Sequence, residues 1–160
     1  MYENYTRQSL PERDYRELLG TALCVFNANN QFIIENILKI SGDQHNWWEL
    51  ELMDKTSGSI LHKVMIEQYG DIVPENIIEL FNILVEKRDR IVHSFQTTYS
   101  MDTEEQILAT KDLKTDEQFI ITREYMMDFI KENDKLNDML YKLRDQLKEQ
   151  REDCKVYRRS

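Results

Sequence analysis

Glycine, proline and cysteine are scarce in this chain, whose 160 residues include 4 Gly, 2 Pro and 2 Cys. So few turn residues argue against an all-β sandwich or barrel and against a glycine-rich phosphate loop. Cys24 and Cys154 lie far apart in the sequence. This spacing favours two free thiols in a reducing compartment and predicts a cytoplasmic protein. Neither the cysteines nor the three histidines have a zinc-ligand spacing, so we expect no metal and no cofactor.

Long apolar runs are also missing. No segment approaches the ~18 consecutive apolar residues of a membrane span. Met1 to Arg7 are polar and aromatic and contain no apolar signal-peptide core. The chain is nevertheless 41% hydrophobic, which is too apolar for a disordered protein. Its length predicts a single domain, residues 1–160, that can bury a core without any contact with a membrane.

Positive charge is in deficit as well, since 21 Lys and Arg face 30 Asp and Glu. The formal net charge of -9 argues against broad, non-specific nucleic-acid binding, which depends on basic side chains. It is compatible with a narrow cleft that is positive only locally. Lys87, Arg88 and Arg90 form one local basic cluster, and the segment after Leu140 forms another.

Apolar residues recur at helical spacing over most of the chain, which predicts a mainly α fold. The first helix is expected to start at a capping box, Ser9–Glu12, to carry apolar positions over Tyr15–Ile40 and to end at Ser41-Gly42. Gly20 and the polar cluster Asn27–Gln31 interrupt this pattern, so a kink or break is expected there.

Short helices are expected over Trp47–Met53 and Ile60–Tyr69, the second ended by Gly70. Pro74 and Glu75 then open a helix with a wide apolar face, which we expect at the centre of the fold. Its main stripe consists of Ile77, Phe81, Leu84, Ile91 and Phe95.

The pattern then changes to polar alternation with β-branched and aromatic residues. Thr97–Tyr99, Gln106–Thr110 and Gln118–Thr122 read as short strands, with a turn at Asp112–Asp116. Thr122 can cap a last long helix over residues 123–160, whose tail is either a frayed end or a coiled-coil seam. The expected fold class is therefore a helical bundle with a small extended or β-hairpin excursion before the last long helix.

One segment could carry chemistry: Lys87-Arg88-Asp89-Arg90-Ile91-Val92-His93-Ser94. Arg88 lies on the apolar stripe, where a charge needs a partner or a use. Asp89 and His93 are four residues apart, so a hydrogen bond between their side chains is expected. Arginine can hold a phosphate and histidine can transfer a proton, and RNA supplies its own nucleophile in the ribose 2′-hydroxyl. On spacing alone, surface salt links explain these residues at least as well.

Arg88-Asp89-x-x-x-His93 resembles the Arg-(polar)-x-x-x-His motif of the HEPN-domain family. The layout is similar too, with the motif near the end of a core helix, then an extended excursion and a last helix. The order of the expected elements is similar over most of the chain, whereas the residues themselves resemble the family over about eight positions. It implies a homodimer that joins two motifs across its interface, and a metal-independent endoribonuclease in toxin–antitoxin, antiviral or other defence systems. RNA and an antitoxin or other defence protein are the partners that it implies.

By that likeness His93 acts as general acid or base, Arg88 binds the scissile phosphate and Asp89 orients them. Lys87, Arg90 and Ser94 are candidate substrate contacts. Two features depart from the family pattern. Five residues along a helix rotate by about 140°, so Arg88 and His93 do not share a face of one protomer. Phe95 stands where one subfamily has a tyrosine that an antitoxin modifies.

Two other function classes stay open. One is a catalytically inactive HEPN-like module that binds nucleotide, nucleic acid or a partner protein. The other is a structural subunit whose last helix forms a coiled coil. Trp47-Trp48 as a base-stacking pair is less expected than core packing. The acidic cluster Asp102, Glu104 and Glu105 reads as a solvated loop, and His45 and His62 read as structural or exposed.

Overall fold

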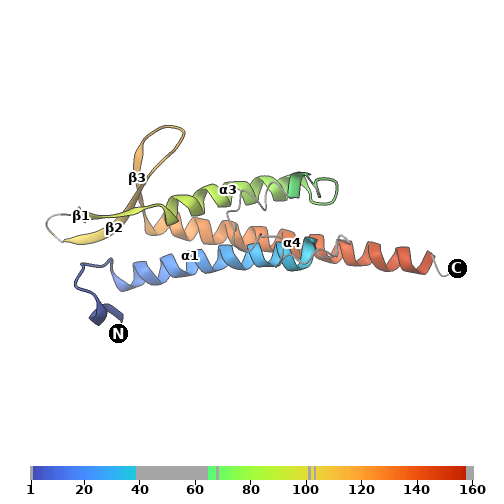
Figure 1. Ribbon diagram of the computed structural model, residues 1–160, viewed down its shortest axis with the longest axis horizontal. Helices are drawn as coiled ribbons and strands as arrows, with labels where there is room; N and C mark the ends of the chain where they lie inside the picture. Colours follow the sequence, from blue (N-terminus) through green and yellow to red (C-terminus); the bar gives the residue numbers. More distant parts are fainter. Residues whose placement is uncertain (1, 39–64, 68, 101, 103, 158–160) are drawn as a thin grey trace.

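Three helices lie side by side along the length of the molecule, with a small sheet at one end (Figure 1). The computed structural model describes residues 2–38, 65–67, 69–100, 102 and 104–157. The long helices are α1 (Arg13–Phe32), α3 (Glu75–Val92) and α4 (Arg123–Tyr157). This arrangement confirms the predicted fold class, a mainly helical chain with a small β excursion before the last long helix. The expectations for Trp47–Met53, for the start of the next short helix and for Ser41-Gly42 lie outside the described residues.

The start of α1 differs from the expected capping box. Glu12 is the N-cap residue, with an extended backbone (ψ 153°), and no side chain caps the helix. The carbonyl oxygen of Ser9 instead accepts a hydrogen bond from the Gln96 side chain at 2.7 Å. The prediction was wrong because α1 starts later than expected, at Arg13, and Ser9 instead contacts the first strand of the sheet.

Helix α1 passes through Gly20 without a break, contrary to expectation. The change of geometry comes later, where a π-helical segment, η2 (Ile33–Leu38), follows Phe32. Asn29 and Asn30, within the polar cluster expected to interrupt the helix, are buried helical residues. The Asn29 side-chain amide donates hydrogen bonds to Asn133 on α4, so this part of the polar cluster belongs to the core and does not end α1.

Tyr69 and Gly70 form the turn that leads into α3. The backbone N–H groups of Ile72 and Val73 donate to the Tyr69 carbonyl at 2.9 and 2.8 Å. A Cβ atom on Gly70 would lie 2.6 Å from the Ile66 carbonyl oxygen, so only glycine fits the turn without a shift of backbone. The helix ending expected at this glycine agrees with the turn observed here.

The centre of the core is an aromatic stack between the three helices. The Phe26 ring on α1 lies 6.1 Å, centroid to centroid, from the rings of both Phe81 on α3 and Phe129 on α4. The predicted stripe of α3 is buried at Ile77, Phe81, Leu84 and Ile91. The prediction that Phe95 is the last member of this stripe is wrong. The helix ends at Val92, and Phe95 is a half-exposed residue of the first strand.

The sheet has three antiparallel strands in the order β1 (Phe95–Ser100), β2 (Glu105–Lys111) and β3 (Gln118–Ile121). These bounds agree with the three predicted strands to within two residues. The turn predicted at Asp112–Asp116 is present, because the Asp112 carboxylate accepts backbone N–H bonds from Lys114 and Thr115 at 2.7 and 2.9 Å.

Tyr15 attaches the sheet to the helices. Its hydroxyl donates to the Ile121 carbonyl at 2.7 Å and accepts from the Leu108 N–H at 3.3 Å. The ring is 1% exposed, and burial raises the pKa of the Tyr15 hydroxyl above its ordinary value. The sheet therefore has a fixed position at the end of α1.

Helix α4 starts as predicted, with the Thr122 hydroxyl accepting the Tyr125 N–H at 3.1 Å. Its buried face carries the expected 3,4 spacing at Met126, Phe129, Asn133, Leu136, Leu140 and Leu143. The C-terminal part of α4 extends beyond the ends of α1 and α3 (Figure 1). No helix among the described residues is long and apolar enough to cross a membrane.

Candidate functional site

The last turns of α3 carry all six residues that the sequence singled out. Lys87 to Arg90 lie within the helix, His93 is its C-cap and Ser94 follows. Successive residues of an α-helix are rotated by about 100°, so these side chains spread around the helix axis. The structure therefore divides them between the core, a cavity on the outer face of α3 and the exposed end of the helix.

Arg88 points into the bundle. Its guanidinium carbon lies 5.1 Å from the centroid of the Phe26 ring, and its side chain is only 17% exposed. The Nε atom is 3.3 Å from an Asp89 carboxylate oxygen, which makes an ion pair between neighbours. A charge on the apolar stripe is accommodated because an aromatic face and a carboxylate both favour the cation.

The expectation of a hydrogen bond between the Asp89 and His93 side chains is wrong. The Asp89 carboxylate pairs with Arg88, and it is the Asp89 backbone carbonyl that accepts the His93 N–H, at 2.9 Å. His93 has left helical geometry, with φ -95° and ψ 23°, because α3 ends there. The regular four-residue spacing that would bring the two side chains together does not extend to the C-cap.

His93 is exposed, and so are the apolar side chains beside it in sequence. Val92 is 48% and Phe95 is 51% exposed. The Ser94 hydroxyl donates to the Ile91 carbonyl at 2.7 Å, so Ser94 closes the end of the helix. An accessible imidazole flanked by apolar surface is suited to proton transfer at an interface.

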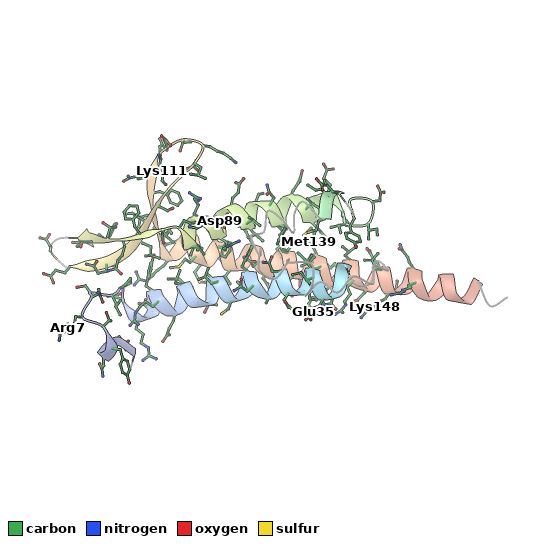
Figure 2. The ribbon with its side chains drawn as sticks, viewed as in Figure 1. Arg7, Glu35, Asp89, Lys111, Met139 and Lys148 are labelled. Atoms are coloured by element: carbon green, nitrogen blue, oxygen red, sulfur yellow. The ribbon has the colours of Figure 1, made fainter. Side chains whose placement is uncertain are left out.

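A cavity of about 390 Å³ lies between the outer face of α3 and the β2–β3 hairpin. We call it the hairpin cavity. Three predicted site residues, Lys87, Asp89 and Arg90, contribute to its wall. The other lining residues are Ile83 and Glu86 on α3, Asp112, Leu113, Lys114 and Phe119 on the hairpin, and Tyr125 on α4. Figure 2 labels Asp89 on α3 and Lys111 on the hairpin that projects beside it.

Each cation of the hairpin cavity has an oxygen partner. Lys87 Nζ lies 2.8 and 2.6 Å from the two carboxylate oxygens of Glu132. Arg90 Nη1 donates to the Lys111 carbonyl at 2.8 Å and so connects α3 to the hairpin. Lys114 Nζ is 3.3 Å from Glu86, and both of these side chains are largely exposed.

Tyr125 forms the inner wall of the hairpin cavity. Burial, followed by the negative charge of Glu132, raises the pKa of the Tyr125 hydroxyl to about 12, and the positive charge of Arg90 opposes that rise. Its ring lies 5.7 Å from the Phe119 ring, with the planes tilted by 49°. The cavity thus has an aromatic side and a charged side.

Sequence reasoning missed the contribution of the hairpin and of Tyr125 to this region. The turn signal at Asp112–Asp116 could have located the hairpin tip, but nothing in the sequence shows that the tip lies beside α3. The buried asparagines were missed as well. Asn29 Nδ2 donates to the backbone and side-chain oxygens of Asn133 at 2.8 and 3.1 Å, and Asn137 Nδ2 donates to Asn29 Oδ1 at 2.9 Å.

The remaining sequence candidates give no second site. His45, His62 and Trp47-Trp48 lie outside the described residues. Asp102 and Glu104 are exposed, whereas Glu105 lies 3.5 Å from Arg123. Within the described ranges, no group of three His, Cys, Asp or Glu side chains could hold a metal ion. No protein-family model, curated protein or solved structure matches the chain.

Proposed function

We propose that this protein is a metal-independent endoribonuclease of HEPN type that acts as a homodimer in a defence or toxin–antitoxin system. The observation that carries the proposal is the division of the motif over two surfaces. Arg88 lies against Phe26 with a small exposed edge, whereas His93 is exposed at the end of α3. A second copy of the chain is the simplest source of an imidazole for each Arg88.

The proposed chemistry needs no group beyond those of the motif and the RNA. His93 removes the proton of a ribose 2′-hydroxyl, and the 2′-oxygen attacks the adjacent phosphorus. The bond from phosphorus to the 5′-oxygen breaks, and that oxygen takes up the proton that His93 has just accepted. The products are a 2′,3′-cyclic phosphate and a 5′-hydroxyl. Arg88 stabilises the negative charge that develops on the phosphoryl oxygens.

The position of Asp89 supports a fixed Arg88. The Asp89 carboxylate lies on one side of the guanidinium, and the Phe26 ring lies on another. A group held in this way loses little freedom when a phosphate binds, which is what electrostatic stabilisation of a transition state requires. Asp89 is therefore proposed to position Arg88, in place of the contact with His93 that the sequence suggested.

The test is cleavage of a fluorescent single-stranded RNA in EDTA by the wild type and by His93→Gln and Arg88→Lys. Both variants are expected to lose at least roughly a hundredfold in rate, because general acid–base catalysis and oxyanion stabilisation each contribute that much. Lys148→Gln is the control, since Lys148 is exposed on α4 well beyond the end of α3 (Figure 2). End analysis of the product should find the cyclic phosphate.

Two outcomes would contradict the proposal. Equal cleavage by wild type and His93→Gln, both purified identically, would mean that a contaminant or another site cuts the RNA. Intact RNA with every preparation would leave the catalytically inactive module, whose binding surfaces need no proton transfer.

A further inference from the structure

We propose that the hairpin cavity binds one nucleoside monophosphate, either as a free ligand or as one unit of an RNA strand. His93 is not among the residues that line this cavity. If the cavity binds one unit of an RNA strand, this inference deepens the proposed nuclease function and rests on it. If the cavity binds a free nucleoside monophosphate, the inference does not depend on the nuclease function.

The size and aromatic side of the cavity suit a nucleobase. A volume of about 390 Å³ is in the range of small-ligand sites. Phe119 and Tyr125 present tilted rings 5.7 Å apart, and Ile83 and Leu113 complete an apolar wall. A flat base can stack on such a surface whatever its identity, because every base has a π-face. The apolar wall therefore favours the binding of a base and does not distinguish one base from another.

The charged side of the cavity suits a phosphate. Arg90 uses one N–H for the Lys111 carbonyl, and a guanidinium has five N–H donors in a planar fork. Among the residues that the structure describes, the Lys114 ammonium pairs with an exposed carboxylate, Glu86, and such surface pairs contribute little to stability. A phosphate that approaches from solvent can replace Glu86 at Lys114 and contact Arg90 without breaking the fold.

The carboxylates of the cavity limit the charge of the ligand. Glu86, Asp89 and Asp112 offset Lys87, Arg90 and Lys114, so the lining is close to neutral. Backbone N–H bonds from Thr115 and Lys114 lower the pKa of Asp112 and keep this carboxylate ionised. A nucleoside triphosphate would bring several more negative charges against these groups, so a single phosphate is the better fit.

The experiment is a calorimetric titration of the full chain with uridine monophosphate, adenosine monophosphate, uridine and inorganic phosphate. Either monophosphate should bind at least roughly tenfold more tightly than uridine or phosphate alone, since each of these contacts one side only. Lys114→Gln should weaken binding by a similar factor, whereas Lys148→Gln, an exposed lysine on α4, should not. Phe119→Leu should weaken the monophosphates and leave phosphate unchanged.

Titration with an uncleavable 2′-O-methyl RNA hexamer distinguishes an RNA strand from a free nucleoside monophosphate as the ligand of the cavity. A strand site binds the hexamer more tightly than the monophosphate, and Lys114→Gln weakens both ligands. A site for the free ligand binds the hexamer no better. The proposal is overturned if no monophosphate binds at about 5 mM, or if Lys114→Gln and Lys148→Gln bind it equally.

The two proposals fail separately. Loss of RNA cleavage in His93→Gln with no monophosphate binding would overturn the cavity site alone. Monophosphate binding that depends on Lys114, in a protein that never cleaves RNA, would overturn the nuclease alone. Lys114 is 79% exposed on the hairpin tip, so its substitution leaves the core untouched.

Discussion

The guanidinium of Arg88 lies over the Phe26 ring, 5.1 Å from its centroid, while 17% of the Arg88 side chain stays exposed. Phe26 also stacks with Phe81 and Phe129, so the Arg88 cation contacts the aromatic stack that joins the three helices. The same contact makes Arg88 a structural residue as well as a proposed functional one. Variants at this position therefore need a measurement of stability beside any measurement of activity.

Replacing Arg88 with Ala should lower the free energy of unfolding by about 1–3 kcal/mol, through loss of the cation–π contact and of the packed side-chain stem. Arg88→Met keeps an apolar stem of similar length and should cost less than Arg88→Ala. Urea titration measures both. Arg13→Ala, at an exposed i,i+4 pair with Glu17, is the control and should change stability by less than about 0.5 kcal/mol. A neutral Arg88→Ala would show that the ring contact contributes nothing.

Mixing two inactive variants tests whether the site is shared between protomers. Arg88→Ala and His93→Ala should each be inactive alone, and together they should recover roughly a quarter of the wild-type rate, because half of the dimers are mixed and each holds one intact site. The measurement is RNA cleavage after the subunits have exchanged. Dimers that exchange but recover no activity would place both groups of the site in one protomer.

The asparagine pair between α1 and α4 should be important for stability. Asn29→Ala removes two donated hydrogen bonds to Asn133, which is 0% exposed, and leaves its oxygens without that donor. We expect a loss of about 2–3 kcal/mol in the free energy of unfolding. Asn27→Ala on the same helix is exposed and should be nearly neutral. Equal effects in a urea titration would mean that the buried amides are replaceable.

Stability should fall at high pH through Tyr125. Its pKa of about 12 in the folded protein is above the ordinary tyrosine value of about 10, so the unfolded chain ionises first as pH rises. The stabilisation is complete below pH 10 and is lost towards pH 12. Between pH 9 and pH 11 the loss should be about 1 kcal/mol. Tyr125→Phe should remove this part of the pH dependence in urea titrations, whereas Tyr99→Phe, on an exposed strand residue, should retain it.

Much of the fold could be predicted because its elements carry strong local signals. The buried stripe of α3 follows from helical periodicity, and the start of α4 follows from the Thr122 cap. The burial of Asn29 could not be predicted, because its partner lies 104 residues away on α4. Ser9 could not cap α1 because the helix starts four residues later, and the contact of Ser9 with the distant Gln96 is not encoded locally.

The segment that carries the candidate site could be predicted from the sequence, but the positions of its side chains could not. Sequence reasoning identified Arg88 as a charge on an apolar stripe, and the Phe26 ring and Asp89 explain it. It failed at His93, where the helix ends and the four-residue spacing stops applying. The hairpin cavity depends on a tertiary contact, Arg90 with the Lys111 carbonyl, that no local pattern encodes.

The bond from the Tyr15 hydroxyl to the Ile121 carbonyl joins residues 106 positions apart, and α1 packs along α4 for much of its length. A ribosome that has released only the first hundred residues has therefore made a helix whose main neighbour does not yet exist. Contacts of such long sequence separation slow folding and leave apolar surface exposed to chaperones in the meantime. The apolar face of α1 is the part of a nascent chain that would most need protection until α4 emerges.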